Sequence, residues 1–202
     1  MRWLRLSSED EMVALFLRTE LTSVRHRPRI GELLDREALP ERLLATPDLT
    51  SPIENARRRR LLSAYRGYEP RIGLFDGFPR DVRWDWMTIA PDELLQVRYI
   101  NYDYWTELSG GSRLARDVPA RVRAGVAPFG VSSEWVIGFA ETFAAGARFP
   151  ALILVTPTPA GDLVVLEGHA RLTAYAMRPE ALPSELEVLL GCSPRMVHWG
   201  LF

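Results

Sequence analysis

Lysine is absent from this chain of 202 residues, and cysteine occurs once, at Cys192. All 25 basic residues are therefore arginine. Without lysine the protein can form no Schiff base, and it cannot hold a phosphate with the lysine of a Walker-type loop. A single cysteine excludes an internal disulfide framework and a cysteine-rich metal site. Any bound phosphate or carboxylate must therefore meet arginine, histidine, backbone N–H groups or a metal ion.

Long hydrophobic runs and a strong net charge are missing as well. The longest strongly apolar run, around residues 149–155, is far too short to span a membrane. The N-terminal segment turns acidic before an apolar stretch of signal-peptide length can form. The formal net charge is −1, so no overall field attracts the protein to nucleic acid or anionic lipid. We therefore expect a soluble, cytoplasmic protein that binds neither nucleic acid nor a membrane.

The first 67 residues carry the start and stop signals of helices, and we interpret residues 1–67 as an N-terminal helical region. Ser8 and Glu11 have the spacing of a capping box that opens a first helix. A weaker helical pattern covers residues 30–45 and is broken near Pro40. Ser51 is the expected N-cap of a third helix, which Gly67 ends.

Four consecutive arginines, residues 57–60, lie inside this third expected helix. At 100° per residue they fan over roughly 300° of the helix circumference, so they cannot form one basic stripe. We expect a solvated face with one or two arginine stems packed against the core. Contact with a ligand or a nucleic acid is the alternative.

Aromatic residues and glycines then crowd into residues 68–86, which we interpret as an aromatic-rich connector. Val82, Trp84 and Trp86 alternate with charged residues, as in a half-buried strand. The connector either seals two layers together or forms the wall of a binding pocket. Residues 87–202 are mixed in pattern and predict an α+β domain. Its expected strands cover residues 87–89, 97–102, 151–155 and 163–166, and its clearest helix covers residues 134–145.

The most informative stretch is Glu167-Gly-His-Ala-Arg171, where an expected strand ends in a glycine turn and a helix begins. The first N–H groups of a helix lack internal partners and carry the positive end of the helix dipole, which suits an anion. Arg171 adds a two-pronged donor, and His169 could hold a phosphoryl oxygen or move a proton. Glu167 could act as a general base or a magnesium ligand. Simple capping, with Arg171 paired to a nearby carboxylate, is the alternative.

The segment from Phe149 to Val155, a turn, and the segment from Leu163 to Tyr175 together resemble the core of the ParB/sulfiredoxin-like superfamily. In that superfamily a strand begins with proline, and a second strand ends in an acid-Gly-His-x-Arg signature that opens a helix. The resemblance is specific over residues 146–177. It implies an α+β fold, a mixed sheet core against which the N-terminal helical region packs, and binding of a nucleotide triphosphate or diphosphate, ATP, ADP or CTP, with Mg²⁺.

Carried over by position, the resemblance implies that Gly168, His169 and Arg171 bind phosphates and that Glu167 lies beside the reacting group. Three features depart from the family. Partition proteins have a helical DNA-binding region after this core, whereas only about 25 residues follow Met177 here. Sulfiredoxin has its catalytic cysteine inside the motif, where this chain has glycine and histidine. The first 67 residues have no counterpart in the resemblance.

Four further residues are candidates by their expected place in such a fold. Arg113, with Ser112 beside it, follows two glycines and could reach the same phosphates, or it could be a surface arginine. Ser133 and Glu134 begin the helix before the first strand of the hairpin and are expected to border the substrate.

Three functional classes remain open. The first is a nucleotide-dependent phosphotransferase acting on a small hydroxylated metabolite such as an amino acid, in which charge neutralisation and positioning do most of the catalysis. The second is a partition-protein-like, DNA-associated nucleotide switch, which the near-neutral charge disfavours. The third is a partner-binding module without chemistry. The aromatic content is compatible with a homodimer face.

Overall fold

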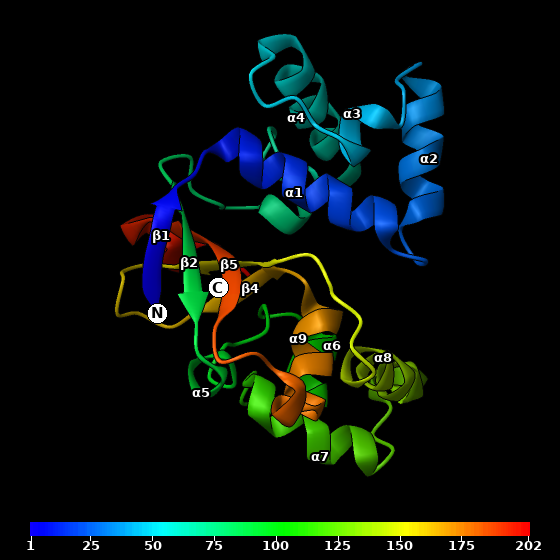
Figure 1. Ribbon diagram of the computed structural model, residues 1–202, viewed down its shortest axis with the longest axis vertical. Coiled ribbons are helices and arrows are strands. Elements are labelled where there is room, and N and C mark those ends of the chain that lie inside the picture. The colour runs from blue at the N-terminus through cyan, green and yellow to red at the C-terminus, as the bar shows by residue number, and fades with distance from the viewer.

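Every residue of strand β3 (Leu152–Thr156) is buried in the computed structural model, which describes residues 1–202. Successive side chains of a strand point to opposite faces, so β3 contributes to two cores. Ile153 and Val155 belong to one apolar cluster, while Leu152 and Leu154 belong to the other. The sheet therefore lies between two layers of helices (Figure 1).

Five strands form one mixed sheet, which confirms the expected α+β class. Their order is β1 (Arg2–Leu6), β2 (Arg83–Ile89), β5 (Leu186–Cys192), β3 and β4 (Val164–Glu167). β3 and β5 run parallel, and the other neighbouring pairs are antiparallel. The predicted hairpin of β3 and β4 is thus confirmed.

Three strand predictions need correction. β1 lies inside the expected helical region, and β5 had no predicted counterpart. The strand expected at residues 97–102 does not form, because only Arg98 makes isolated bridges, to Leu114 and Val164. The separate strand expected at residues 87–89 is the second half of β2, which begins at Arg83.

Helices α1 (Glu9–Thr22), α2 (Arg27–Arg36), α3 (Arg42–Ala45) and α4 (Pro52–Arg66) cover one face of the sheet, and we call them the helical layer. The predicted N-caps are present: Ser8 accepts from the Glu11 N–H at 3.1 Å, and Ser51 accepts from the Glu54 N–H at 3.3 Å. The capping box at Ser8 is only half formed, because the Glu11 carboxylate accepts from Arg5 and Ser7 instead. Gly67 ends α4 with a φ of 79°, in the left-handed region that glycine adopts readily.

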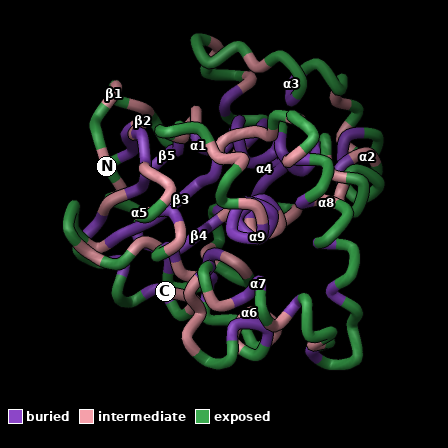
Figure 2. The backbone as a smooth tube through the Cα atoms, turned by 60° about the horizontal axis from the view of Figure 1, so that its bottom comes forward, coloured by how far each residue is buried: buried purple, intermediate pink, exposed green.

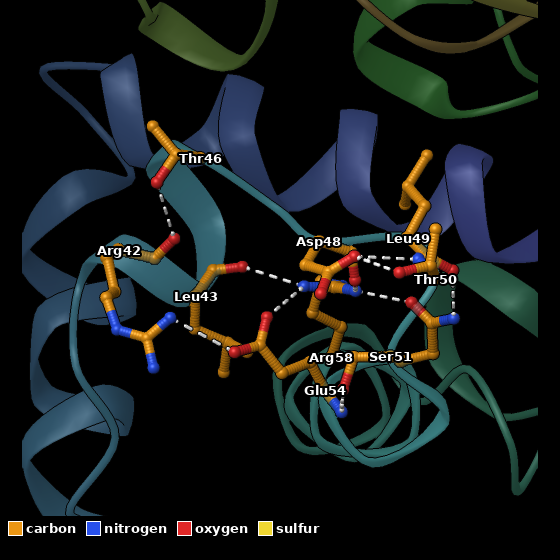
Figure 3. Close-up of polar contacts among 10 residues, drawn as sticks. Arg42, Leu43, Thr46, Asp48, Leu49, Thr50, Ser51, Glu54 and Arg58 are labelled. Carbon is orange, nitrogen blue, oxygen red and sulfur yellow. Dashed lines mark hydrogen bonds and ion pairs between the residues drawn. The ribbon is translucent and has the colours of Figure 1, made fainter.

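Arg58 of α4 is fully buried, and its neighbours in the four-arginine run are not. Its guanidinium donates to the Leu43 carbonyl at 3.1 Å, the Asp48 carbonyl at 2.7 Å and the Asn55 side chain (Figure 3). The carboxylate of Glu54 lies 3.4 Å away. One arginine of the run thus fastens the loop between α3 and α4, as the packed-stem interpretation predicted.

The other face is covered by α5 (Pro91–Leu94), α6 (Asp103–Leu108), α7 (Val118–Arg123), α8 (Glu134–Ala144) and α9 (His169–Met177). Helix α9 is the most deeply buried of them, and Figure 2 shows it end-on beside the sheet. None of the helices has the length and apolar character needed to cross a membrane. Single 3₁₀ turns occupy Gly73–Phe75, Ala115–Asp117, Pro128–Gly130, Pro179–Ala181 and Pro194–His198.

The three expected segments share this sheet. β1 comes from residues 1–67, and β2 begins in the expected connector and ends beyond its boundary at residue 86. The connector's aromatic rings pack into the core of the helical layer. Phe75 lies edge-on to Tyr68 and Phe78, and Phe78 lies 5.3 Å from Trp199. These contacts agree with a seal between the layers.

Candidate functional site

Strand β4 ends at Glu167 and α9 begins at His169, so the predicted strand, glycine turn and helix are all present. Gly168 has a φ of 109°, which side-chain-bearing residues rarely adopt. A Cβ at this position would lie 2.5 Å from the Leu152 side chain and 3.0 Å from Arg171 Nη2. The glycine is therefore required by the turn and by close packing behind it.

Arg171 is buried, and the N–H donors of its guanidinium bond to acceptors of the protein itself. Nη1 donates to the carbonyls of Pro150 and Ala151, the latter at 2.7 Å, and Nη2 forms an ion pair with Glu167. The two carbonyls lie directly before β3. Arg171 thus ties the start of β3 to the end of β4 and has few donors left for a ligand.

Burial raises the pKa of Glu167 to about 7, with the Arg171 charge acting in the opposite direction. The charges of Glu20 and Arg66 also act on this carboxyl, although both belong to the helical layer. A carboxyl group that is partly ionised near neutral pH is suited to moving a proton.

The ring of His169 stacks on Trp105, with centroids 5.3 Å apart and an angle of 19° between the planes. Burial, together with the charges of Arg66 and Arg171, lowers the pKa of His169 to about 3. The ring is therefore neutral at physiological pH. Its Nε2 is buried and has no hydrogen-bond partner. These properties favour a hydrogen bond to a ligand over the proton transfer that the sequence also allowed.

The helical layer contributes a second polar group of residues near the motif. Arg66 ends α4, and its Nη2 donates to Glu20 Oε1 of α1 at 2.8 Å. The Arg66 guanidinium lies 4.3 Å from the centre of the Tyr65 ring, and His26 Nδ1 lies 3.5 Å from Glu20 Oε2. Sequence reasoning missed these residues because no spacing rule connects α1 or α4 to residue 167. The one signal in the sequence was Glu20, a glutamate among the apolar positions of α1.

Three of the four secondary candidates bond to other parts of the chain, and the fourth is exposed. Arg113 donates to the Phe202 carbonyl at 2.8 Å, and the Ser112 hydroxyl accepts from the Leu114 N–H at 3.1 Å. Ser133 is buried and donates to the Val126 carbonyl at 2.8 Å. Glu134 is exposed at the start of α8. No hydrogen bond or ion pair joins any of the four to the motif.

The residues offer little to a metal ion by themselves. No group of three or more potential metal-ligating side chains is present, and the carboxylate of Glu167 is shared with Arg171. Magnesium commonly takes one or two carboxylates and completes its shell with phosphate oxygens and water. A magnesium ion here would therefore depend on a bound phosphate chain for its other ligands.

No protein-family model, curated protein or solved structure matches this chain.

Proposed function

We propose that the protein is a nucleotide-binding phosphotransferase of the ParB/sulfiredoxin-like type, with Glu167 as the general base for the hydroxyl of a small metabolite such as an amino acid. The observation that carries the proposal is the largely buried Glu167 carboxyl at the end of β4, just before α9, whose pKa is raised to about 7. Catalytic bases are most effective when their pKa lies near the working pH. The expected ligands are ATP or another nucleotide with Mg²⁺.

The start of α9 supports phosphate binding. The Leu172 N–H donates to the Gly168 carbonyl at 2.8 Å, the first bond of the helix. The N–H groups of His169, Ala170 and Arg171 therefore have no acceptor within α9, and they lie at the positive end of its dipole. Phosphate oxygens are suitable acceptors for such groups. Mg²⁺, when bound, would neutralise part of the phosphate charge.

Glu167 accepts the proton of the acceptor hydroxyl as that oxygen forms a bond to phosphorus. The bond between phosphorus and its bridging oxygen breaks, and the electron pair leaves with the nucleoside diphosphate. The proton stays on the Glu167 carboxyl until water removes it. The positive charges of Arg66 and Arg171 stabilise the negative charge that spreads over the phosphoryl oxygens.

Nucleotide binding is tested by thermal unfolding with ATP, ADP, CTP and GTP, each with and without Mg²⁺. A ligand at one hundred times its Kd stabilises by about 2.7 kcal/mol. For a chain of this size we expect Tm to rise by about 5–10 °C. No shift with any nucleotide would contradict the proposal.

Catalysis is tested with Glu167→Gln in an assay of ADP formation with a panel of hydroxylated amino acids. We expect the variant to bind nucleotide and lose turnover, because the amide cannot accept the proton. Wild-type kcat should increase as the pH rises through about 7, where the Glu167 carboxyl ionises. Glu141→Gln is the matched control, since Glu141 lies on α8, is exposed and pairs with Arg178, the residue after α9. Full turnover in Glu167→Gln would falsify the role of the base.

A partner-binding module is the second candidate. Exposed apolar side chains support it, because four of them lie within nine residues around the start of α8. Phe129 is 67% exposed and Trp135 is 45% exposed, and Val131 and Ile137 lie between and beyond them. This candidate leads if no nucleotide changes the Tm.

A further inference from the structure

Two arginines act electrostatically on Glu167, and they differ in the donors that they have free. Arg171 is 6% exposed and bonds to two carbonyls and a carboxylate. Arg66 is 31% exposed, its one hydrogen-bond partner in the chain is Glu20, and its Nε has none. An arginine carries five N–H donors, so Arg66 can bind an oxyanion without giving up Glu20.

Unpartnered polar atoms surround Arg66. Glu20 is 3% exposed, and its Oε2 has His26 Nδ1 at 3.5 Å but accepts no hydrogen bond; the buried hydroxyl of Tyr65 forms none either. His169 Nε2 is a third such atom, on the motif itself. Buried polar groups normally find partners because leaving one unsatisfied costs free energy. These atoms lie in one neighbourhood, because Arg66 stacks on Tyr65, pairs with Glu20 and acts electrostatically on His169.

The free groups specify the chemistry of a ligand. The spare donors of Arg66 suit an oxyanion, a phosphate or a carboxylate. Glu20 Oε2, which lies 3.5 Å from His26 Nδ1 without a hydrogen bond, can accept from a hydroxyl or an ammonium group. The Tyr65 hydroxyl can donate or accept. A small organic anion that carries a hydroxyl or ammonium group satisfies all three.

We infer that the helical layer forms the ligand-binding half of the site, in which Arg66 holds an oxyanion and Glu20 holds a hydroxyl or ammonium group beside Glu167. The inference rests on the proposed function, because it assigns residues that hold its reactants. It gives the helices of residues 1–67 a role in binding, and it transfers the main anion contact from Arg171 to Arg66.

The test compares Arg66→Ala and Arg66→Gln with Arg60→Ala. Arg60 lies on the same helix, is 76% exposed and pairs with Glu37, so it is a matched control. Binding of ADP, inorganic pyrophosphate and glycerate is measured by calorimetry. Far-UV circular dichroism and urea unfolding show which variants are folded, and the more conservative Arg66→Gln serves if Arg66→Ala unfolds.

We expect both Arg66 variants to lose at least tenfold in affinity for an anionic probe, and Arg60→Ala to bind as wild type does. Loss for ADP and pyrophosphate identifies the oxyanion as a nucleotide phosphate, and loss for glycerate alone identifies it as the small substrate. Glu20→Gln should weaken glycerate binding tenfold with pyrophosphate binding unchanged.

Unchanged affinities in folded Arg66 variants would overturn the inference, as would failure of every probe to bind the wild type. The proposed function is tested separately by Glu167→Gln. Suppose that Glu167→Gln has no turnover and the Arg66 variants bind normally. The proposed phosphotransferase activity would then be supported, and the proposed role of the helical layer in binding would be wrong.

Discussion

Glu167 and His169 have opposite pKa shifts although they are two residues apart. Burial disfavours the charged form of either group, so it raises the pKa of the carboxyl to about 7 and lowers that of the imidazole to about 3. Both groups therefore tend to be neutral where they are buried. The polar turn fits between two apolar layers for this reason, and the Arg171 charge keeps Glu167 within reach of ionisation at neutral pH.

These shifts predict how stability depends on pH. Between about 4.5 and 7 the folded protein keeps a proton on Glu167 that the unfolded chain has lost, so this group makes stability fall as pH rises. Between about 3 and 6.5 the unfolded chain protonates His169 and the folded protein does not, so this group makes stability rise with pH. The two effects offset each other from about pH 4.5 to 6.5.

His169→Phe removes the group that makes stability rise with pH, and it keeps an aromatic ring stacked on Trp105. We expect its free energy of unfolding to fall as the pH rises from about 4.5 to 7, and to fall relative to wild type from about pH 3 to 6.5, by at most about 1.4 kcal/mol per pH unit. Glu167→Gln should show the opposite slope below pH 6.5. Urea unfolding at half-unit pH steps measures both, and parallel profiles for the two variants and wild type would show that the shifts are absent.

At the scale of elements, the helical layer depends on contacts between a helix and the loop before it. Arg58 of α4 reaches back to the carbonyls of Leu43 and Asp48 (Figure 3). The Asp48 carbonyl lies in the loop and the Leu43 carbonyl near the end of α3, so neither has a partner in a regular ladder and each needs such a donor. The buried guanidinium therefore determines how the α3–α4 loop closes over the core.

Arg58→Met keeps the length of the side chain and removes its donors. We expect it to lower the free energy of unfolding by about 3–5 kcal/mol, because buried acceptors lose a charged partner. Arg57→Met is the matched control, one residue earlier and exposed, with an expected change within about 0.5 kcal/mol. Urea denaturation compares the two, and equal effects would show that burial of Arg58 contributes nothing specific.

At the scale of the whole molecule, the two layers depend on one sheet. β3 sends alternate side chains into both cores, and β1 of the N-terminal region pairs with β2. Trp105 packs against both clusters and stacks on His169. Losing either layer would expose one face of β3 to water.

We therefore expect the chain to unfold in one cooperative transition. Far-UV circular dichroism, which reports mostly on helices, and tryptophan fluorescence should give the same urea midpoint. A fragment of residues 1–67 should not form the stable helical layer, because its apolar face and β1 lose their partners in the sheet. Two separated transitions, or a folded fragment, would show independent domains.

Some of this could be read from the sequence because the signals are local. The caps at Ser8 and Ser51 and the end of α4 at Gly67 depend on residues within four positions of each other. The glycine turn between β4 and α9 was found from its own five residues. Glu167, His169 and Arg171 were placed together correctly, since residues adjacent in the chain remain adjacent in the fold.

Other features depend on partners that are distant in the chain. β1 is a strand because β2 pairs with it, about eighty residues later, and residues 97–102 are not one because only Arg98 finds bridge partners. Arg113, Ser112 and Ser133 are bonded to other backbone groups, which their own sequence does not specify.

The sequence by itself therefore determined the motif, its turn and the helix that follows, through short-range sterics and hydrogen bonding. Only the tertiary structure decided that the donors of Arg171 are used within the protein and that Arg66 has donors to spare. Arg171 is bonded to the carbonyls before β3, and the charges of Arg66 and Glu20 act on Glu167 because α1 and α4 pack on the sheet. Burial between the two layers, which no local sequence pattern encodes, also decided the pKa values of Glu167 and His169.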